Sequence, residues 1–280
     1  MAGNPTHSAP RALAIHGILL AYTAVALFPI VLVIMNSFKS RRGIFGAPLL
    51  PPSETTFSLA GYATVLGRAN FPLYFGNSLT VTLGALFLVL LTGAMAAFAL
   101  SEYRFRGNAL LGLYLAIGIM IPIRLGSISI IDLVVGLGLI NTLTALVLVY
   151  TAMSLPMAIF ILGEFMRTVP TELKDAARMD GVSEYGLFFR IVLPLVRPAA
   201  ATVGVFTMIP IWNDLWFPLI LAPSEPKRTV TLGAQQFIGQ FVTDWNAVLA
   251  ALSLSIVPVL VLYAIFSRQL IKGLTSGAVK

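Results

Sequence analysis

Glu172-Leu-Lys-Asp-Ala-Ala-Arg-Met-Asp-Gly181 and, farther along, Ile191-Val-Leu-Pro194 are the stretches on which the assignment of this chain depends. Both belong to a polar, charged segment, 166–197, in a chain that is otherwise strongly apolar. Charged groups are costly inside a lipid bilayer, so a membrane protein would keep such a segment outside it. The segment therefore predicts a surface that another molecule binds.

The composition indicates an integral membrane protein. Of 280 residues, 58% are hydrophobic and only 10% are charged, and the mean hydropathy is +0.92. A soluble domain carries roughly a quarter charged residues, so this chain cannot cover a water-facing surface. The net charge of +7 comes from Lys and Arg scattered among loops, which indicates membrane topology rather than nucleic-acid binding. There is no cysteine, which excludes disulfides and thiol chemistry.

Six apolar runs are long enough to cross a bilayer, which takes about 20 mostly apolar residues. They are about 12–35, 77–100, 108–131, 142–165, 198–221 and 247–270, and Pro122 and Arg124 interrupt the third. The first run predicts a retained span rather than a secretory signal, because it is long and no Ala-x-Ala-like site closes it. We expect one transmembrane domain over 1–280, with core spans over about 77–270 and a C-terminal tail at 271–280.

The basic residues favour an orientation with both termini in the cytoplasm. That orientation puts eleven of the 18 Lys and Arg inside, and it makes 166–197 a cytoplasmic loop. The cluster Lys39-Ser-Arg-Arg42 counts against it. The segment from Ser37 to Gly76, rich in proline, is expected to be an outside loop lying along the membrane.

Local signals predict two short helices in the polar segment. Thr171 can cap the first helix, and Gly181 can end it in a left-handed conformation. Ser183 can cap the second helix, which Pro194 and Pro198 then end. The hairpin could dock into another protein or lie on lipid headgroups, and local physics favours neither.

Apolar residues on the first helix predict its contact surface. Leu173, Ala176 and Ala177 recur at three- and four-residue spacing, which places them on one face. The two alanines leave that face shallow, so a pocket on another protein could enclose it.

The pattern Ala176-Ala177, Gly181, Ile191-x-Leu193-Pro194 resembles the EAA loop of the membrane subunits of bacterial ABC importers. The usual Glu of that motif is Asp175 here. Other stretches look like the carbohydrate-uptake branch, and these are Phe28-Pro29, Ser37-Phe38-Lys39, Asn77-Ser78-Leu79, Tyr103-Arg-Phe-Arg-Gly107, Gly138-Leu-Ile-Asn-Thr142, Trp212-Asn213-Asp214 and Gly273-Leu-Thr-Ser-Gly-Ala-Val-Lys280. The chain is most similar to the second permease subunit of maltose- and glycerol-phosphate-type importers.

The resemblance implies an all-α, six-span permease of the type I importer class in the bacterial inner membrane. Its loop would form a coupling helix that docks on an ATPase subunit, and its C-terminal tail would reach the ATPase interface. The coupling residues implied are Glu172, Asp175, Ala176, Ala177, Asp180, Gly181, Ile191, Leu193 and Pro194. The tail residues implied are Gly277, Ala278 and Lys280.

The resemblance also implies partners. These are a second, homologous permease subunit, two ATP-binding subunits that hold ATP and Mg²⁺, an extracytoplasmic solute-binding protein and membrane lipid, with no nucleic acid. The sequence itself lacks a P-loop, because no Gly-Lys pair exists in it. We expect no cofactor on this chain.

Charged groups inside spans mark candidate transport residues. Trp212, Asn213, Asp214 and Trp216 combine aromatic faces with planar hydrogen-bonding groups, which suits a sugar. The alternative is that Asp214 pairs with a neighbouring span while the tryptophans mark a membrane interface.

No other polar residue predicts a reaction centre. Arg124 and Asp132 are expected near the outer face, and Glu164 at a membrane interface. His7 and His16 have no other metal-binding residue near them in sequence, and no nucleophile–base spacing indicates catalysis. A sugar-importer permease is the leading hypothesis, with an ion-coupled secondary transporter as the alternative and a membrane enzyme as a third class.

Overall fold

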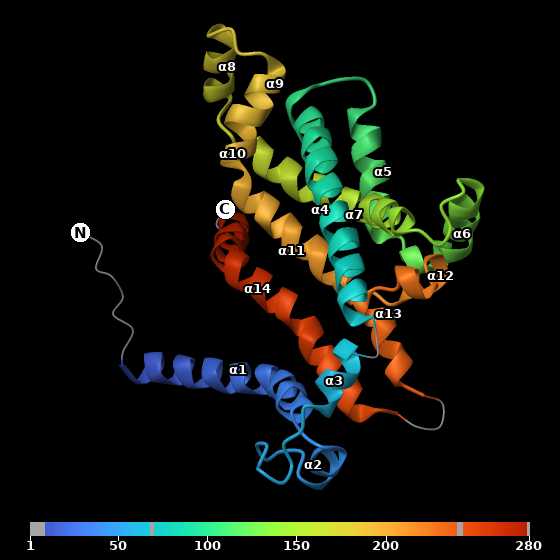
Figure 1. The fold of residues 1–280 in the computed structure, drawn as a ribbon. Coiled ribbons are helices and arrows are strands. Elements are labelled where there is room, and N and C mark those ends of the chain that lie inside the picture. The colour runs from blue at the N-terminus through green and yellow to red at the C-terminus, as the bar shows by residue number, and fades with distance from the viewer. Residues whose placement is uncertain (1–8, 68–69, 240–242, 279–280) are drawn as a thin grey trace. The chain divides into compact units, whose positions relative to one another are not determined.

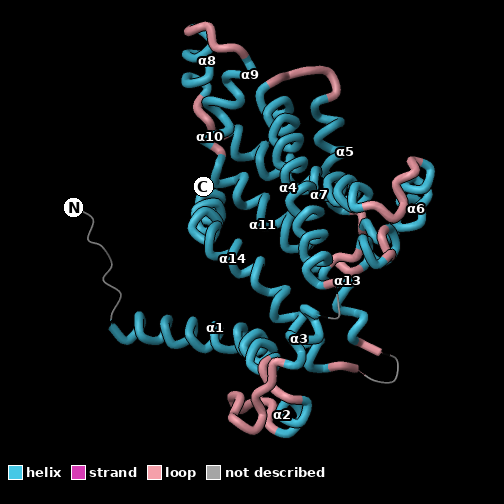
Figure 2. The backbone as a smooth tube through the Cα atoms, viewed as in Figure 1, coloured by secondary structure: helices cyan, strands magenta, loops and turns pink. Residues whose placement is uncertain are grey.

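A computed structural model describes residues 9–67, 70–239 and 243–278, and the regular secondary structure in these ranges is helical (Figures 1 and 2). The first helices are α1 (Ala9–Ser37), α2 (Arg41–Gly46), α3 (Ala60–Gly67), α4 (Phe71–Glu102), α5 (Asn108–Met120), α6 (Ser127–Gly136) and α7 (Leu143–Arg167). The later helices are α8 (Thr171–Met179), α9 (Glu184–Gly186), α10 (Leu193–Leu195), α11 (Arg197–Asn213), α12 (Trp216–Leu221), α13 (Val230–Ala234) and α14 (Trp245–Ala278). A π-helical segment, Leu187–Val192, joins α9 to α10.

The chain divides into two compact units. The first unit contains Met1–Asn70 and Ala234–Leu254, and the second contains Phe71–Gly233 and Ser255–Lys280.

In the first unit, a buried lysine organises the chain after α1. The Lys39 ammonium donates to the side-chain oxygen of Asn36 and to the carbonyl of Ala47, at 2.9 Å each. Its burial lowers the pKa of Lys39 from the usual lysine value. Lys39 belongs to the basic cluster that counts against the predicted orientation. The Lys39 ammonium is bound by carbonyl oxygens within the fold. The presence of a lysine here therefore reflects packing as well as membrane topology.

In the second unit, α4, α7 and α11 pack against one another (Figure 1). The buried side of α4 is a stripe at three- and four-residue spacing, as expected for an amphipathic helix. It includes Tyr74, Ser78, Val81, Ala85, Val89, Gly93 and Ala97. A Cβ atom on Gly93 would lie 3.3 Å from the Cβ of Ala158, so the glycine lets α4 and α7 approach closely.

Helices suited to crossing a membrane match most of the predicted spans. Three are long and apolar enough on their own, within α1, α4 and α7. The third predicted span is a bent pair of helices, with a bend of 91° between α5 and 123–136. The fifth predicted span, 198–221, covers α11 and α12, and a bend of 75° separates α11 from the hairpin arm 184–195 that precedes it. The predicted interruption at Pro122 is confirmed. In α14, Trp245–Val261 is a shorter apolar helix, and the count of six spans stays a prediction.

Replacing Gly93 with leucine should destabilise the protein, because the added side chain must displace Ala158. We expect a loss of about 1–3 kcal/mol in the free energy of unfolding, which is typical of overpacking. Gly76→Leu is the matched control, since Gly76 lies on the same helix with no atom within 4 Å of an added Cβ. Thermal unfolding of both variants in detergent measures the difference. Equal unfolding temperatures would contradict close packing at Gly93.

Candidate functional site

The polar segment folds into a helical hairpin at one end of the second unit, close to the end of α4 (Figure 1). Its first arm is α8, and its second arm is a continuous helix from Glu184 to Leu195. The prediction that Thr171 caps α8 is wrong. Pro170 occupies the capping position with extended backbone, and Thr171 is already the first helical residue. Glu172 lies in the first turn, where its charge is favourable to the helix dipole.

The turn of the hairpin is fixed by Gly181, as predicted. Its φ is +79°, in the left-handed region. The amide of Gly181 donates to the carbonyl of Arg178, and the amide of Val182 donates to that of Ala177, at 3.0 Å each. This pair of bonds is a Schellman motif, and Val182 packs against the core cluster that contains Ala177.

The second arm begins where the sequence predicts. The Ser183 side chain caps it by accepting a hydrogen bond from the amide of Gly186 at 3.2 Å. The arm then widens into the π-helical segment. Pro194, the second residue after this segment, has no N–H to donate, so a regular hydrogen-bond ladder cannot continue through it. After α10 the chain turns at Val196 into α11.

The prediction that Leu173, Ala176 and Ala177 share one contact face is wrong. Ala177 is only 7% exposed and packs in the chain's own core with Leu187 and Phe188. Leu173 and Ala176 are exposed on another side of α8. The buried face of α8 contains Lys174 and Ala177. Lys174 can be buried there because it is bound by the carboxylate of Glu102, at the end of α4.

Sequence reasoning missed the most exposed apolar side chains of the hairpin. Met179 is 88% exposed and Tyr185 is 74% exposed. Met179 follows Leu173 and Ala176 at three-residue spacing, and that spacing was the available signal. We call these four residues, Leu173, Ala176, Met179 and Tyr185, the hairpin face.

The other predicted coupling residues divide by exposure. Glu172, Asp175, Asp180 and Gly181 are exposed. Ile191, Leu193 and Pro194 are half-buried, and Ile191 and Leu193 pack against the core. They therefore hold the second arm in place.

A cluster of charges joins the hairpin to the end of α4. The Glu102 carboxylate, 9% exposed, accepts a hydrogen bond from the Lys174 ammonium through one oxygen and from Arg178 at 2.7 Å through the other. Arg178 also donates to Glu184 at 2.8 Å, and the Tyr103 hydroxyl donates to Glu184 at 2.6 Å. We call these five residues the Glu102 clasp. Glu102 directly precedes the quoted stretch Tyr103–Gly107 and was not predicted as a site residue.

Two groups of the clasp, Arg178 and Tyr103, have raised pKa values. Hydrogen bonds to Glu184 and Glu102 raise the pKa of Arg178 above its usual value. Partial burial, followed by the hydrogen bond to Glu184, raises the pKa of Tyr103 to about 12. Tyr103 therefore remains a hydrogen-bond donor, and its contribution to stability is lost only as the pH rises toward about 12.

A second polar cluster surrounds Asp214, where α11 ends. The Asp214 carboxylate accepts hydrogen bonds from the Tyr150 hydroxyl at 2.8 Å and from the amide of Phe217 at 3.0 Å, so it caps α12. Arg124 lies 3.7 Å from it and is largely exposed. Asp214 thus pairs with the neighbouring helix α7, as the alternative interpretation expected.

The other residues of this motif have different environments. Trp212 is 1% exposed and donates from its indole to the carbonyl of Ser255 at 3.0 Å. Trp216 is 40% exposed and donates to the Ser127 hydroxyl at 2.9 Å. Asn213 is exposed. Only Asn213, Asp214 and Trp216 therefore offer a surface to a solute.

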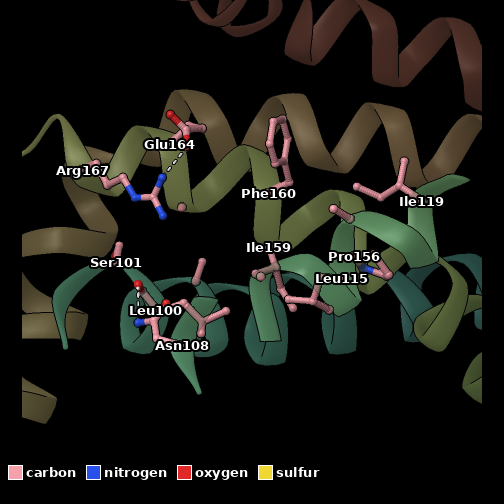
Figure 3. Close-up of a pocket in the computed structure, with 14 residues that line it drawn as sticks. Leu100, Ser101, Asn108, Leu115, Ile119, Pro156, Ile159, Phe160, Glu164 and Arg167 are labelled. Atoms are coloured by element: carbon pink, nitrogen blue, oxygen red, sulfur yellow. Dashed lines mark hydrogen bonds and ion pairs between the residues drawn. The ribbon is translucent and has the colours of Figure 1, made fainter. Parts of the chain in front are cut away.

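An apolar pocket of about 230 Å³ lies between α4, α5 and α7 (Figure 3). Its polar residues include Ser101 and Asn108, and the Glu164–Arg167 ion pair, with a separation of 2.7 Å, lies at its edge. The Asn108 amide is occupied by the carbonyls of Leu100 and Tyr103. The predicted transport residues are not in its lining. Within the described ranges, no group of three His, Cys, Asp or Glu side chains could hold a metal ion.

The residues predicted to form the tail contact lie at or beyond the end of α14. Gly277 and Ala278 are its last described residues. Lys280 lies outside the described residues.

These features define an all-helical membrane protein with a polar helical hairpin outside its long apolar helices. The chain belongs to the family described as the binding-protein-dependent transport system inner membrane component, whose model matches residues 89–275. The matched region contains both the hairpin and the Asp214 cluster.

Individual relatives agree with the family. The chain is 38% identical to a putative ABC transporter permease protein of Caldicellulosiruptor sp., over 94% of each chain. It is 33% identical to the diacetylchitobiose uptake system permease protein NgcG of Streptomyces coelicolor, over 94% of this chain and 87% of that one. It is also 33% identical to the arabinooligosaccharides transport system permease protein AraQ of Halalkalibacterium halodurans, over 91% and 92%.

The fold is shared with a bacterial ABC transporter involved in the import of the acidic polysaccharide alginate. The TM-score is 0.80 at 22% sequence identity, over 95% of this chain and 99% of that chain. The predicted all-α permease fold is confirmed. The chain is a permease subunit of an ABC transporter rather than an enzyme, and ATP hydrolysis belongs to separate subunits.

Gly181→Val should loosen the hairpin turn, because a β-branched residue in the left-handed region is strained by about 1–2 kcal/mol. Gly181→Asn is the matched control, since asparagine tolerates that conformation and the space beside Gly181 is open. Hydrogen exchange of amides over 178–184 should be faster in the valine variant than in the asparagine variant. Equal exchange rates would mean that the turn does not depend on its left-handed residue.

Proposed function

We propose that this chain forms half of the translocation path of an ATP-driven importer for a sugar, oligosaccharide or polyol. The observation that carries the proposal is the exposed hairpin face on a permease that has no ATP site of its own. The relatives named for diacetylchitobiose and arabinooligosaccharide transport support a carbohydrate as the solute. The complete importer would contain a second, homologous permease subunit, two ATP-binding subunits that hold ATP and Mg²⁺, and an extracytoplasmic binding protein.

The hairpin face would enter a cleft on the ATPase subunit. Its apolar side chains are exposed, and so are the carboxylates of Glu172, Asp175 and Asp180 within and directly after α8. Apolar anchors with a charged rim are typical of protein interfaces. The remaining predicted coupling residues would hold this face in place. Ala177 does so by packing in the core, and Gly181 does so by forming the turn. Gly277, Ala278 and Lys280 remain candidates for a tail contact.

The exposed side of the Asp214 cluster is the proposed solute contact. Asn213 offers a planar amide, and Trp216 offers an aromatic face that suits the C–H surface of a sugar ring. The Asp214 carboxylate is oriented by Tyr150 and the start of α12, so it could accept hydrogen bonds from solute hydroxyls in a fixed geometry.

Docking of the hairpin on the ATPase subunit is tested by substituting two adjacent alanines, Ala176 and Ala177. Ala176→Trp enlarges an exposed residue of the hairpin face, so it should abolish co-purification of the ATPase subunit and ATP-dependent uptake while the protein remains folded. Ala63→Trp is the control, because Ala63 is an exposed alanine outside the hairpin. Ala177→Trp should instead lower thermal stability, since its site is filled by the core. Normal ATPase association in Ala176→Trp would argue that the hairpin lies on lipid.

Orientation is tested with single cysteines, because the native chain has none. The proposed topology has both termini in the cytoplasm of a bacterial inner membrane. In intact cells, an impermeant thiol reagent should label Thr55→Cys but not Tyr185→Cys, and both should react after permeabilisation. Both positions are exposed in the fold. The reverse pattern would invert the topology.

A further inference from the structure

The hairpin is covalently continuous with two of the three helices that pack together in the second unit. Residues 168–170 connect it to α7, and α10 leads through Val196 into α11. The chain after α4 instead runs into α5. A displacement of the hairpin can therefore act directly on the end of α4 only through noncovalent contacts, and the Glu102 clasp is the polar contact at that end.

The clasp joins α8 to the last residue of α4, and it joins the second arm to Tyr103, the residue that follows α4. Lys174 and Arg178 lie on α8, and Glu184 begins the second arm. Beside the clasp, the rings of Phe98 and Phe188 are 5.3 Å apart. An apolar contact of this kind can slide, whereas charge-assisted hydrogen bonds fix both distance and direction. The clasp therefore determines the register of α4 against the hairpin.

Stability alone does not explain the clasp. The side chains of Glu102 and Lys174 are 9% and 10% exposed, so both charges have lost most of their water. A desolvated ion pair contributes little net stability compared with well-packed apolar residues, although removing one partner is costly. What the pair supplies is a fixed geometry between two elements that are distant in sequence.

We propose that Glu102 is a positioning residue that transmits movement of the hairpin to α4, so that the clasp couples ATPase docking to transport. This inference rests on the proposed function, because it takes the hairpin to be the ATPase contact. None of the five clasp residues belongs to the hairpin face, although Arg178 also binds the rim carboxylate of Asp175 at 3.2 Å. Loss of the clasp should therefore leave the ATPase bound and hydrolysing ATP while uptake fails.

The first test measures uptake and ATP hydrolysis in the same reconstituted importer. Glu102→Gln should lower uptake per ATP hydrolysed roughly tenfold, with ATPase co-purification unchanged. Glu164→Gln is the matched control, because it removes an ion pair of similar separation whose side chains are 59% and 49% exposed. The control should stay within about twofold of the native protein. Unchanged uptake per ATP in a folded Glu102→Gln importer would overturn the proposal.

The second test replaces the Glu102–Lys174 ion pair with a covalent bridge. It keeps the proposal testable if the Glu102→Gln protein does not fold. A Glu102→Cys, Lys174→Cys protein should be uncoupled, and a short bifunctional methanethiosulfonate reagent that bridges the two thiols should restore uptake. A reducing agent should abolish the restored uptake. The monofunctional reagent is the control, and mass spectrometry verifies the bridge. Full uptake without a bridge, equal rescue by the monofunctional reagent, or no rescue by a verified bridge would each overturn the proposal.

Failure of the proposal differs from failure of the proposed function. If the hairpin does not dock on the ATPase, Ala176→Trp will leave ATPase association normal. If docking holds but the clasp transmits nothing, Ala176→Trp will lose the ATPase while the clasp variants transport normally.

Discussion

A backbone inside a bilayer must satisfy its hydrogen bonds within the protein, and this constraint explains where the helices of the second unit break. One break lies at Pro122, between α5 and α6, and another lies between Asn213 and Trp216. The two breaks meet, since Arg124 beside the first lies 3.7 Å from Asp214 in the second. Asp214 also caps α12 and accepts from Tyr150, and the Thr231 hydroxyl donates to its carbonyl at 2.6 Å. The carboxylate and the carbonyl of Asp214 at the second break therefore both have partners within the protein.

The same helices connect the two polar clusters. α11 begins beside the hairpin and ends at the Asp214 cluster, and its 17 residues span roughly 25 Å at 1.5 Å each. α7 contributes Tyr150 to the Asp214 cluster and continues to the hairpin. α7 contains Pro156 and α11 contains Pro210, but neither helix is broken between the hairpin and the Asp214 cluster, so we expect a rotation of the hairpin to move the helix ends around Asp214 as well. In the importer that we propose, the Glu102 clasp would bring α4 into that same movement.

Local features of the hairpin could be predicted from the sequence, and long-range ones could not. The left-handed turn at Gly181 and the cap at Ser183 depend on neighbouring residues only, and both are confirmed. The break at Pro122 is local for the same reason. The rotation of α8 depends on Lys174 reaching Glu102, 72 positions away in sequence, and no periodicity of the helix reveals that partner. Trp212 was likewise misjudged, because an indole inside a membrane protein can pack in the core as readily as face a solute.

The adjacent alanines illustrate how one motif can satisfy two separate constraints. Ala177 is small because Leu187, Phe188 and the other core residues fill the space around it, so its size is set within this chain. Ala176 faces outward, and nothing in the chain limits its size. A small residue there is required only if another protein covers that side of α8. Of these two consecutive residues, Ala177 is therefore constrained by folding and, in the importer that we propose, Ala176 by docking. Only the exposed alanine, Ala176, carries information about a partner.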